Sequence, residues 1–281
     1  MIDTINSSSA EPPAGDAHPQ PPALELAPTP WTIHPDRIAW LAIDIETQPN
    51  EDVAVPEPEV KLGNLKDEEK IERKLIEARE AQYANAALDP NYGRIISVHA
   101  AATLKGCGDH EIVVGSYVRE DYKWIAAGDP TTADLRDDAE RKLLNKLGDL
   151  LIGPDKVFTF NGAGFDVPFW HRRGLLLGTR VPRLSINPYE CARMTSTHVD
   201  LMLVLHGWEV GAGRSNPLSV SRRLADYARL ILNEEHPEEI QNKLAYKEWF
   251  ARGDVEPLRR AGEWDVMQTL RLALRTYQYY P

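Results

Sequence analysis

The chain has 281 residues, of which 42% are hydrophobic and 27% are charged. This is enough apolar sequence for one large domain with its own core, and it excludes a wholly disordered protein. No run approaches the roughly 18 apolar residues of a membrane span, so we expect no membrane partner. The two cysteines exclude a disulfide framework and a multi-cysteine zinc site. The N-terminus lacks a basic segment followed by an apolar one, so we expect no secretory signal and a cytoplasmic location.

The net charge of −11 argues at first against a nucleic-acid partner, because phosphate binding favours Lys and Arg. However, several of the carboxylates precede Arg37, which is the first basic residue of the chain. Further carboxylates could be neutralised by bound cations. The acidic total is therefore compatible with an enzyme that holds a phosphate substrate through divalent metal ions.

The first segment, residues 1–35, is rich in proline and contains no Lys or Arg. It shows no hydrophobic period. We expect a disordered, proline-rich tail here and a folded domain over residues 36–281. The tail has an alternative reading as an arm that docks a protein partner.

The predicted elements after the tail begin with a short buried strand over 38–43, followed by an acidic, proline-containing loop. The pattern then predicts, in chain order, a helix over 67–87, strands over 94–103 and 111–118, a helix over 139–152, a strand over 157–160, and helices over 165–177, 218–232, 238–250 and 263–277. Strands followed by alternating helix and strand, and then by helices, indicate a sheet domain of the α/β or α+β class.

Acidic residues stand at the ends of these elements in three blocks. Asp44 and Glu46 follow the first strand two residues apart, so both side chains point to the same face. Asp166 opens a helix after a glycine-containing turn, and Asp265 lies beside the apolar stripe of the last helix. Each block is weak evidence alone, because strand ends are often charged and the helix dipole favours an acid in the first turn.

Taken together and in this order, the three blocks resemble the DEDD superfamily of 3′–5′ exonucleases. Members of this superfamily have a ribonuclease H-like fold, an α/β architecture with a mixed β-sheet flanked by helices. The similarity is greatest to the branch related to the proofreading domain of family B DNA polymerases. It covers about residues 37–277, and the phrases at 93–96, 198–201 and 249–254 also look like this branch.

The resemblance implies catalytic and metal-binding roles for Asp44, Glu46, Asp166 and Asp265. Carboxylate oxygens suit two Mg²⁺ or Mn²⁺ ions rather than zinc, and such a pair can activate water and stabilise a leaving oxygen. By resemblance, Asp44 contacts both ions, Glu46 and Asp265 hold the ion on the nucleophile side, and Asp166 holds the second. The residues expected to contact substrate are Ile45, Thr47, Asn161, Phe165 and Arg172.

The sequence departs from this family at the general base. The resemblance implies a tyrosine four positions, or a histidine five positions, before Asp265. Those positions hold Ala261 and Arg260, and neither side chain accepts a proton at neutral pH. This leaves open a slow nuclease, a base from elsewhere in the chain, an engineered substitution, or an inactive protein. We expect Ala261→Tyr, one helical turn from Asp265, to raise hydrolysis at least about tenfold.

Other polar residues favour simpler roles. Asp200 precedes an apolar run and is a structural group in preference to a fifth metal ligand. Glu263 projects from a different helix face than Asp265 and is a weak alternative base. The pairs at 222–223 and 259–260 are more typical of solvated helix faces than of nucleic-acid contacts.

The sequence therefore predicts a metal-dependent 3′–5′ exonuclease that hydrolyses phosphodiester bonds at single-stranded 3′ ends, with DNA favoured over RNA. The preference for DNA rests only on the polymerase-related branch. The alternative is a weak or inactive module that uses the same fold to bind nucleic-acid ends or a replication or repair protein.

Overall fold

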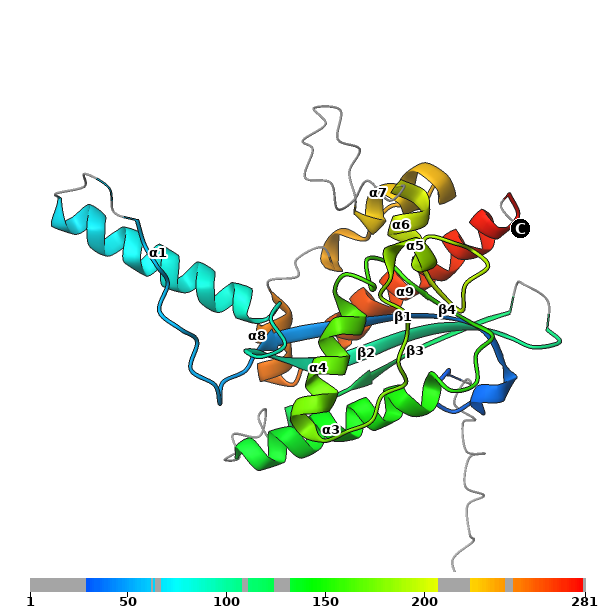
Figure 1. Cartoon of the computed structure of the whole chain (residues 1–281), viewed down its shortest axis with the longest axis horizontal. Helices are drawn as coiled ribbons and strands as arrows, with labels where there is room; N and C mark the ends of the chain where they lie inside the picture. The colour runs from blue at the N-terminus through cyan, green and yellow to red at the C-terminus, as the bar shows by residue number, and fades with distance from the viewer. Residues whose placement is uncertain are drawn as a thin grey trace, which may run out of the picture.

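A computed structural model describes residues 29–61, 63, 67–107, 111–123, 132–206, 223–240 and 245–279. Most of the expected tail, and parts of two expected helices (218–222 and 241–244), lie outside these residues. The described chain forms a five-stranded sheet with helices on both faces, which confirms the predicted α/β fold (Figure 1).

The described elements, in chain order, are η1 (Pro35–Arg37), β1 (Ile38–Pro49), α1 (Glu68–Ala86), β2 (Gly93–Leu104), β3 (Ile112–Val118), α3 (Ala133–Leu150), β4 (Lys156–Thr159), α4 (Asp166–Leu177), α5 (Pro188–Cys191), β5 (His198–Asp200), α6 (Leu201–His206), α7 (Leu224–Tyr227), η3 (Ala228–Leu232), η4 (Glu238–Ile240), α8 (Tyr246–Arg252) and α9 (Glu256–Tyr277). From β3 to α6 each strand is followed by one or two helices, and the described elements after α6 are all helical.

The sheet has the strand order β3-β2-β1-β4-β5, which places β1 at its centre. β1, β2 and β3 pair antiparallel, whereas β4 pairs parallel to β1 and β5 pairs parallel to β4. Parallel neighbours need a crossover connection, and α3 and α4 precede β4 and β5 in the chain. The central strand is therefore flanked by one antiparallel and one parallel neighbour.

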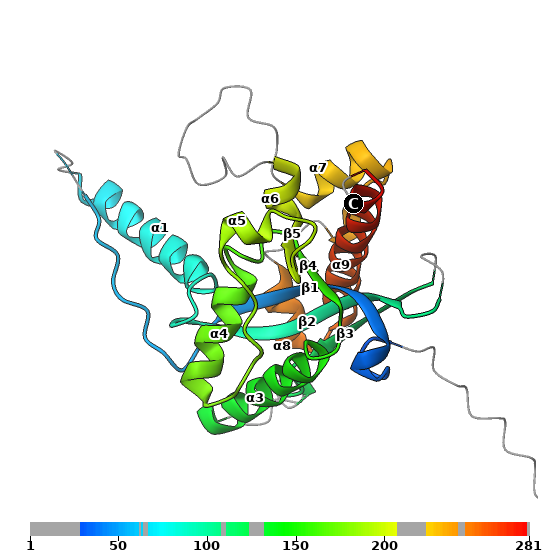
Figure 2. The ribbon, with the colours of Figure 1, turned by 45° about the vertical axis from the view of Figure 1, so that its right-hand side comes forward.

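Two apolar layers cover the two faces of the sheet. Ile43 and Ile45 of β1 belong to a core with Leu147 of α3 and Trp170 of α4. On the other face, Ala42 packs in a second core that includes Val266 of α9. Figure 2 shows α3 and α9 on opposite sides of the strands. Because side chains alternate along a strand, the even-numbered residues of β1 from Trp40 to Glu46, between its two register shifts, face α9.

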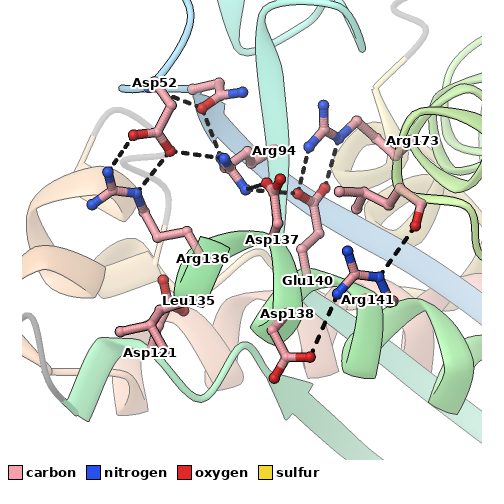
Figure 3. A network of polar contacts seen from close by, with 12 residues as sticks. Asp52, Arg94, Asp121, Leu135, Arg136, Asp137, Asp138, Glu140, Arg141 and Arg173 are labelled. Atoms are coloured by element: carbon pink, nitrogen blue, oxygen red, sulfur yellow. Dashed lines mark hydrogen bonds and ion pairs between the residues drawn. The ribbon is translucent and has the colours of Figure 1, made fainter. Parts of the chain in front are cut away.

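Buried ion pairs tie one of these layers to the sheet (Figure 3). Arg94 of β2 is 2% exposed and contacts Asp137 of α3 at 2.6 Å and Asp52, beyond β1, at 2.8 Å. Glu140 of α3 is fully buried and contacts both Arg94 at 3.3 Å and Arg173 of α4 at 2.6 Å. Buried charges are costly unless they are paired, so this network fixes α3, α4 and β2 relative to one another.

Several predicted boundaries are corrected by the structure. β1 runs to Pro49, so Asp44 and Glu46 lie inside the strand rather than after its end. α3 begins at Ala133 because Thr132 caps it, its hydroxyl accepting from the Leu135 N–H. The expected helix over 263–277 begins at Glu256.

The helices and strands between residues 178 and 250 differ from the predicted elements more than those of the rest of the chain do. The sequence pattern predicts neither α5 nor β5, because both are too short for a hydrophobic period to appear. Of the helix expected over 238–250, the described residues form a 3-10 turn, η4, and the helix α8; residues 241–244 lie outside the described part of the chain.

The described end of the expected tail contacts the sheet domain. Trp31 packs on Tyr117 of β3 with ring centroids 5.8 Å apart, and Ile33 packs against the larger core. The backbone of Pro35 lies so close to Gly153 that a Cβ there would be 2.4 Å from the Pro35 carbonyl oxygen. Residues 29–35 therefore belong to the fold, and the remainder of the expected tail lies outside the described residues.

Candidate active site

The first candidate residues lie on the central strand. Asp44 and Glu46 share the face of β1 that is turned toward α9, and they pair across the antiparallel ladder with His99 and Ser97 of β2. Asp44 is half-buried and Glu46 is 9% exposed. Both carboxylates are thus held on rigid backbone at the middle of the sheet.

The third carboxylate comes from α9. Val266 and Leu270 of α9 are fully buried against the sheet, and this packing turns the neighbouring Asp265 toward β1. The carboxylates of Asp44, Glu46 and Asp265 each offer an oxygen within 4.8 Å of the others. We call these residues the acidic triad. Its donors are all hard carboxylate oxygens, so the acidic triad could hold a divalent metal ion.

A glycine allows α9 to approach the sheet at this point. A Cβ on Gly262 would lie 2.1 Å from the His99 ring, so only glycine fits over that side chain. The ring of His99 lies between Ser97, 2.8 Å from Nε2, and Ser116, 2.7 Å from Nδ1. Ser116 in turn donates to the carboxylate of Glu263 at 2.9 Å. The carboxylate of Glu263, the weak alternative base of the sequence, therefore accepts a hydrogen bond from β3.

Asp166 occupies a different environment from the triad. It begins α4, is 2% exposed, and its Oδ1 accepts from the backbone N–H of Ile45 at 3.1 Å. Burial raises the pKa of Asp166 to about 7, and the negative charges of Asp200 and Glu46 add to the rise. The fold thus brings Asp166 to β1, but its oxygens are not among those that meet within 4.8 Å.

Asp200 shapes the turn that precedes α4. Its carboxylate accepts from the backbone N–H groups of Asn161 at 2.9 Å, Ala163 at 2.9 Å and Met202 at 3.0 Å. These bonds hold Asn161 in the left-handed region, with φ of 68°. Burial raises the pKa of Asp200, while the N–H donors oppose that rise. The carboxylate has the structural role that the sequence favoured.

A cleft of about 620 Å³ opens beside the triad. Its described lining includes two triad members, Asp44 and Asp265, together with one expected substrate residue, Asn161. The further lining residues are Phe160, Met202, Arg223, Leu224, Ala225, His236 and Thr269.

The other residues expected to bind substrate lie elsewhere. Ile45 is buried under α4 with its N–H bonded to Asp166, and Thr47 is half-buried farther along β1. Phe165 packs on Phe169 with ring centroids 5.5 Å apart. Arg172 is exposed on α4. Among the described residues that line the cleft, Asn161 alone comes from the expected substrate set.

Sequence reasoning missed most of the cleft. Thr269 carried a usable signal, since it lies one helical turn after Asp265 on the same face of α9. The sequence favours a solvated helix face for Arg223, and His236 lies outside every acidic block. Neither carried a motif, because both reach the cleft through tertiary packing of the segment after β5.

The position expected for a general base is closed. Ala261 is 2% exposed and packs in a third apolar cluster with Ile96, Leu258 and Phe250. A side chain at this position is therefore surrounded by apolar groups.

Comparison with known families decides the classification. The family model of the RNase H superfamily matches residues 101–276, which is more than half of the chain. The chain belongs to the RNase H superfamily. The matched region contains Asp166 and Asp265, whereas Asp44 and Glu46 precede it. Membership of the RNase H superfamily indicates a nuclease acting on nucleic acid, and such nucleases usually use divalent metal ions, with which the acidic triad agrees.

Among solved structures, this RNase H superfamily member is similar to the family B DNA polymerase from the hyperthermophilic archaeon Pyrobaculum calidifontis. The two are 16% identical with a TM-score of 0.49, over 86% of this chain and 25% of the polymerase chain. The chain thus spans about a quarter of the polymerase that it matches. No curated protein sequence gives a significant match. In the described residues, no helix has the length and apolar character needed to cross a membrane.

Proposed function

We propose that the protein is a metal-dependent 3′–5′ exonuclease that hydrolyses phosphodiester bonds at single-stranded 3′ ends, with DNA preferred over RNA. The observation that carries the proposal is the acidic triad, with oxygens from β1 and α9 within 4.8 Å of one another at the edge of a cleft. The direction of cleavage and the preference for DNA rest on the similarity of the three acidic blocks to DEDD exonucleases.

Asp44, Glu46 and Asp265 would hold one divalent ion, and by resemblance Asp44 and Asp166 would hold a second. Bound ions supply Lewis acidity that activates water and stabilises the leaving oxygen of the phosphodiester. The chain's own residues bind and orient the strand. Arg223, which pairs with Asp226 at 3.0 Å, would bring a guanidinium to the cleft wall for a phosphate, and Phe160, which packs on Tyr227, would offer an aromatic side chain to a base.

The test uses 5′-labelled single-stranded DNA and RNA oligomers incubated with Mg²⁺, Mn²⁺ or EDTA. We expect a descending ladder with either ion, faster on DNA, and none with EDTA. A single internal cut, or no product with either ion, would contradict an exonuclease.

A second candidate function is a binding module that grips nucleic-acid ends or a replication or repair protein without hydrolysis. The burial of Ala261 favours it, because the position expected for a base cannot supply one. Binding of an oligomer in EDTA and in Mn²⁺, with no turnover at enzyme excess, would support this candidate against the exonuclease. The proline-rich tail expected over residues 1–35 remains a proposed arm for such a protein partner.

A further inference from the structure

A groove of about 780 Å³ lies between α3 and α4, on the side of the sheet opposite α9. Its described lining comes from the C-terminal half of α3, from α4 and from the segment that follows α4. Ile152, Leu175, Val181 and Pro182 supply apolar side chains to it. We call it the α3–α4 groove. Its volume is within the range of sites that hold ligands.

Two apolar side chains of the groove are open to solvent. Leu175 of α4 is 81% exposed, and Ile152, two residues after the end of α3, is 73% exposed. Single exposed apolar side chains are common on protein surfaces, but apolar side chains that share one groove are typical of a surface that binds another segment. We therefore expect an occupant that brings apolar side chains of its own.

The segment after α4 gives the groove a basic wall. Arg180 and Arg183 line it and are exposed, and within the described residues neither guanidinium pairs with a carboxylate. Asp149 of α3 is the acidic residue of the described lining. Charge complementarity favours an occupant that carries a carboxylate next to its apolar side chains.

The N-terminal segment of this chain has the composition that the groove favours. Residues 1–28 contain four carboxylates and no Lys or Arg. The leucines of this segment are Leu24 and Leu26, which flank Glu25. Side chains alternate along an extended segment, so an extended conformation would direct both leucines to one side and Glu25 to the other. This segment would place two leucines in the groove and a carboxylate at its mouth, where long arginine side chains can meet it.

The described chain begins close to one end of the groove. Pro35 packs so tightly on Gly153 that a Cβ there would lie 2.4 Å from the Pro35 carbonyl oxygen, and Gly153 directly follows Ile152. Figures 1 and 2 both show the first described residues, in dark blue, beside the C-terminal end of α3. Leu26 precedes Thr29 by three residues, so the Cα atoms of the two are at most about 11 Å apart. The leucines of the tail are therefore tethered near this end of the groove.

We propose that residues 24–26 of this chain occupy its own α3–α4 groove, with Leu24 and Leu26 against Leu175 and with Glu25 at the basic wall. A short tether gives the segment an effective concentration on the order of millimolar at the groove, so weak contacts are sufficient. The groove lies on the opposite side of the sheet from the acidic triad. Its occupancy therefore does not depend on the proposed nuclease function.

The first test compares two matched variants of the full chain by NMR. Leu24→Glu with Leu26→Glu removes the apolar contacts, whereas Ile2→Glu with Ile5→Glu adds the same charges elsewhere in the same segment. We expect the first pair to shift the backbone amide signal of Leu175 and the second pair to leave it at the wild-type position. A signal that stays in place in both variants, or shifts equally in both, would overturn the proposal.

The second test supplies the segment as a separate molecule. A fluorescent peptide with the sequence of residues 19–30 should bind the full chain that carries Leu24→Glu and Leu26→Glu. It should bind the wild type at least about tenfold more weakly, because the tethered segment competes for the groove. Equal binding to the two proteins, or no binding at peptide concentrations of several millimolar, would overturn the proposal. A peptide with Glu25→Arg should bind more weakly, and unchanged affinity would contradict the part assigned to the basic wall.

Two neighbouring leucines of α4 locate the binding site of the peptide. Leu175→Glu, added to the protein with the altered tail, should abolish peptide binding. Leu176→Glu is the control, because Leu176 is 55% exposed and is not among the lining residues of the groove. Both side chains are exposed, so neither substitution should unfold α4. Equal peptide binding by the two variants would place the peptide elsewhere and overturn the proposal.

A photocrosslink identifies which chain fills the groove. Isotope-labelled and unlabelled full chains, each with p-benzoylphenylalanine in place of Ala27, are mixed and irradiated. We expect mass spectrometry to find links from position 27 to residues 171–183 or 145–152 within one isotopic form. Links between labelled and unlabelled chains would assign the groove to the tail of a second copy. That result, links to other parts of the chain, or no links would each overturn the proposal.

Discussion

The carboxylates around β1 divide into two kinds according to what they contact. Asp44, Glu46 and Asp265 bring oxygens within 4.8 Å of one another, and like charges at such distances favour a bound cation. Asp166 and Asp200 instead accept backbone N–H bonds in buried positions, where their pKa values are raised. The same functional group therefore serves as a candidate ligand in one place and as a backbone partner in the other.

Asp44→Asn tests the triad at the scale of one residue. Removing one charge at almost constant volume should weaken Mn²⁺ binding at least about tenfold and abolish hydrolysis, since the charge is what attracts the cation. At an ion concentration of about 100 times Kd, binding should stabilise the wild type by about 2.7 kcal/mol. Calorimetric titration and thermal unfolding with and without Mn²⁺ measure both effects. If Mn²⁺ raised the Tm of Asp44→Asn as much as it raises the Tm of the wild type, the ion would bind at another site.

Ala261→Tyr tests a position where sequence and structure disagree. The sequence suggests that a tyrosine here would add a base and raise the rate. The structure surrounds Ala261 with a packed apolar cluster, so the larger side chain should cost about 1–3 kcal/mol of stability and add no rate. Ala81→Tyr, at an exposed site on α1, is the control and should cost little. A faster enzyme of unchanged Tm would restore the expectation from sequence.

At the scale of elements, short β5 organises the start of α4. Asp200 ends β5, pairs in register with Thr159 at the end of β4, and accepts from the N–H groups of the turn before α4. That turn places Asn161 on the cleft wall and leads to Asp166 beneath β1. The three-residue strand thus positions two of the candidate site residues.

Asp200→Asn should therefore loosen the turn more than the sheet. The substitution replaces the charged carboxylate, which accepts from several backbone N–H groups, with a neutral amide. Hydrogen bonds to a charged acceptor contribute about 1.5–3 kcal/mol, so the substitution should cost free energy of unfolding of that order. Hydrogen exchange should accelerate at the amides of Asn161 and Ala163 and stay unchanged in β3. Asp155→Asn, at an exposed ion pair with Lys105, serves as the control with little effect. Uniform acceleration throughout the protein would indicate global unfolding and contradict a local role.

At the scale of the whole molecule, the ion network of Figure 3 joins three elements and the segment after β1. Arg94, Glu140 and Arg173 are almost fully buried, so each depends on its partners for compensation. Asp52 closes the network at its more exposed end, where it also pairs with Arg136. The network holds α4 against the sheet from the side opposite the acidic triad.

The network predicts a pH dependence of stability. The hydrogen bond from Arg136 lowers the pKa of Asp52, with further lowering by the charge of Arg94. Because the pKa of Asp52 is lower in the folded protein than in the unfolded chain, its stabilisation is complete above the ordinary pKa of an Asp side chain. The stabilisation is lost as the pH falls through the pKa of Asp52 in the folded protein. Asp52→Asn should thus cost about 1–3 kcal/mol near pH 7.

The difference between wild type and Asp52→Asn should shrink as pH falls below about 4, where the wild-type carboxylate is also neutralised. Urea unfolding at several pH values measures it. Asp138→Asn, at an exposed position with ion pairs to Arg141 and Lys142, should change stability by less than about 1 kcal/mol at every pH. A penalty for Asp52→Asn that is the same at pH 7 and pH 3 would contradict the assigned cause.

The order and type of most elements follow from local sequence alone. The buried run at 38–43, the amphipathic period of α1 and the apolar stripe of α9 each express a repeat that neighbouring residues share. The same is true of the acidic blocks: spacing places Asp44 and Glu46 on one face, and position places Asp265 beside an apolar stripe. These features depend only on residues close together in the sequence, so they can be predicted before the tertiary structure is known.

Only the tertiary structure decided which of these groups meet. Gly262 lets α9 pack closely on the sheet, which brings the Asp265 carboxylate near those of Asp44 and Glu46 on β1. Asp166 begins a different helix, and its carboxylate accepts from the backbone N–H of Ile45. Ala261 looks like a vacant catalytic position in the sequence and is a packed core residue in the fold. His236 lacks any local signal, because it reaches the cleft through ion pairs and apolar contacts with residues far along the chain. Such long-range packing has no period, and a single sequence does not display it.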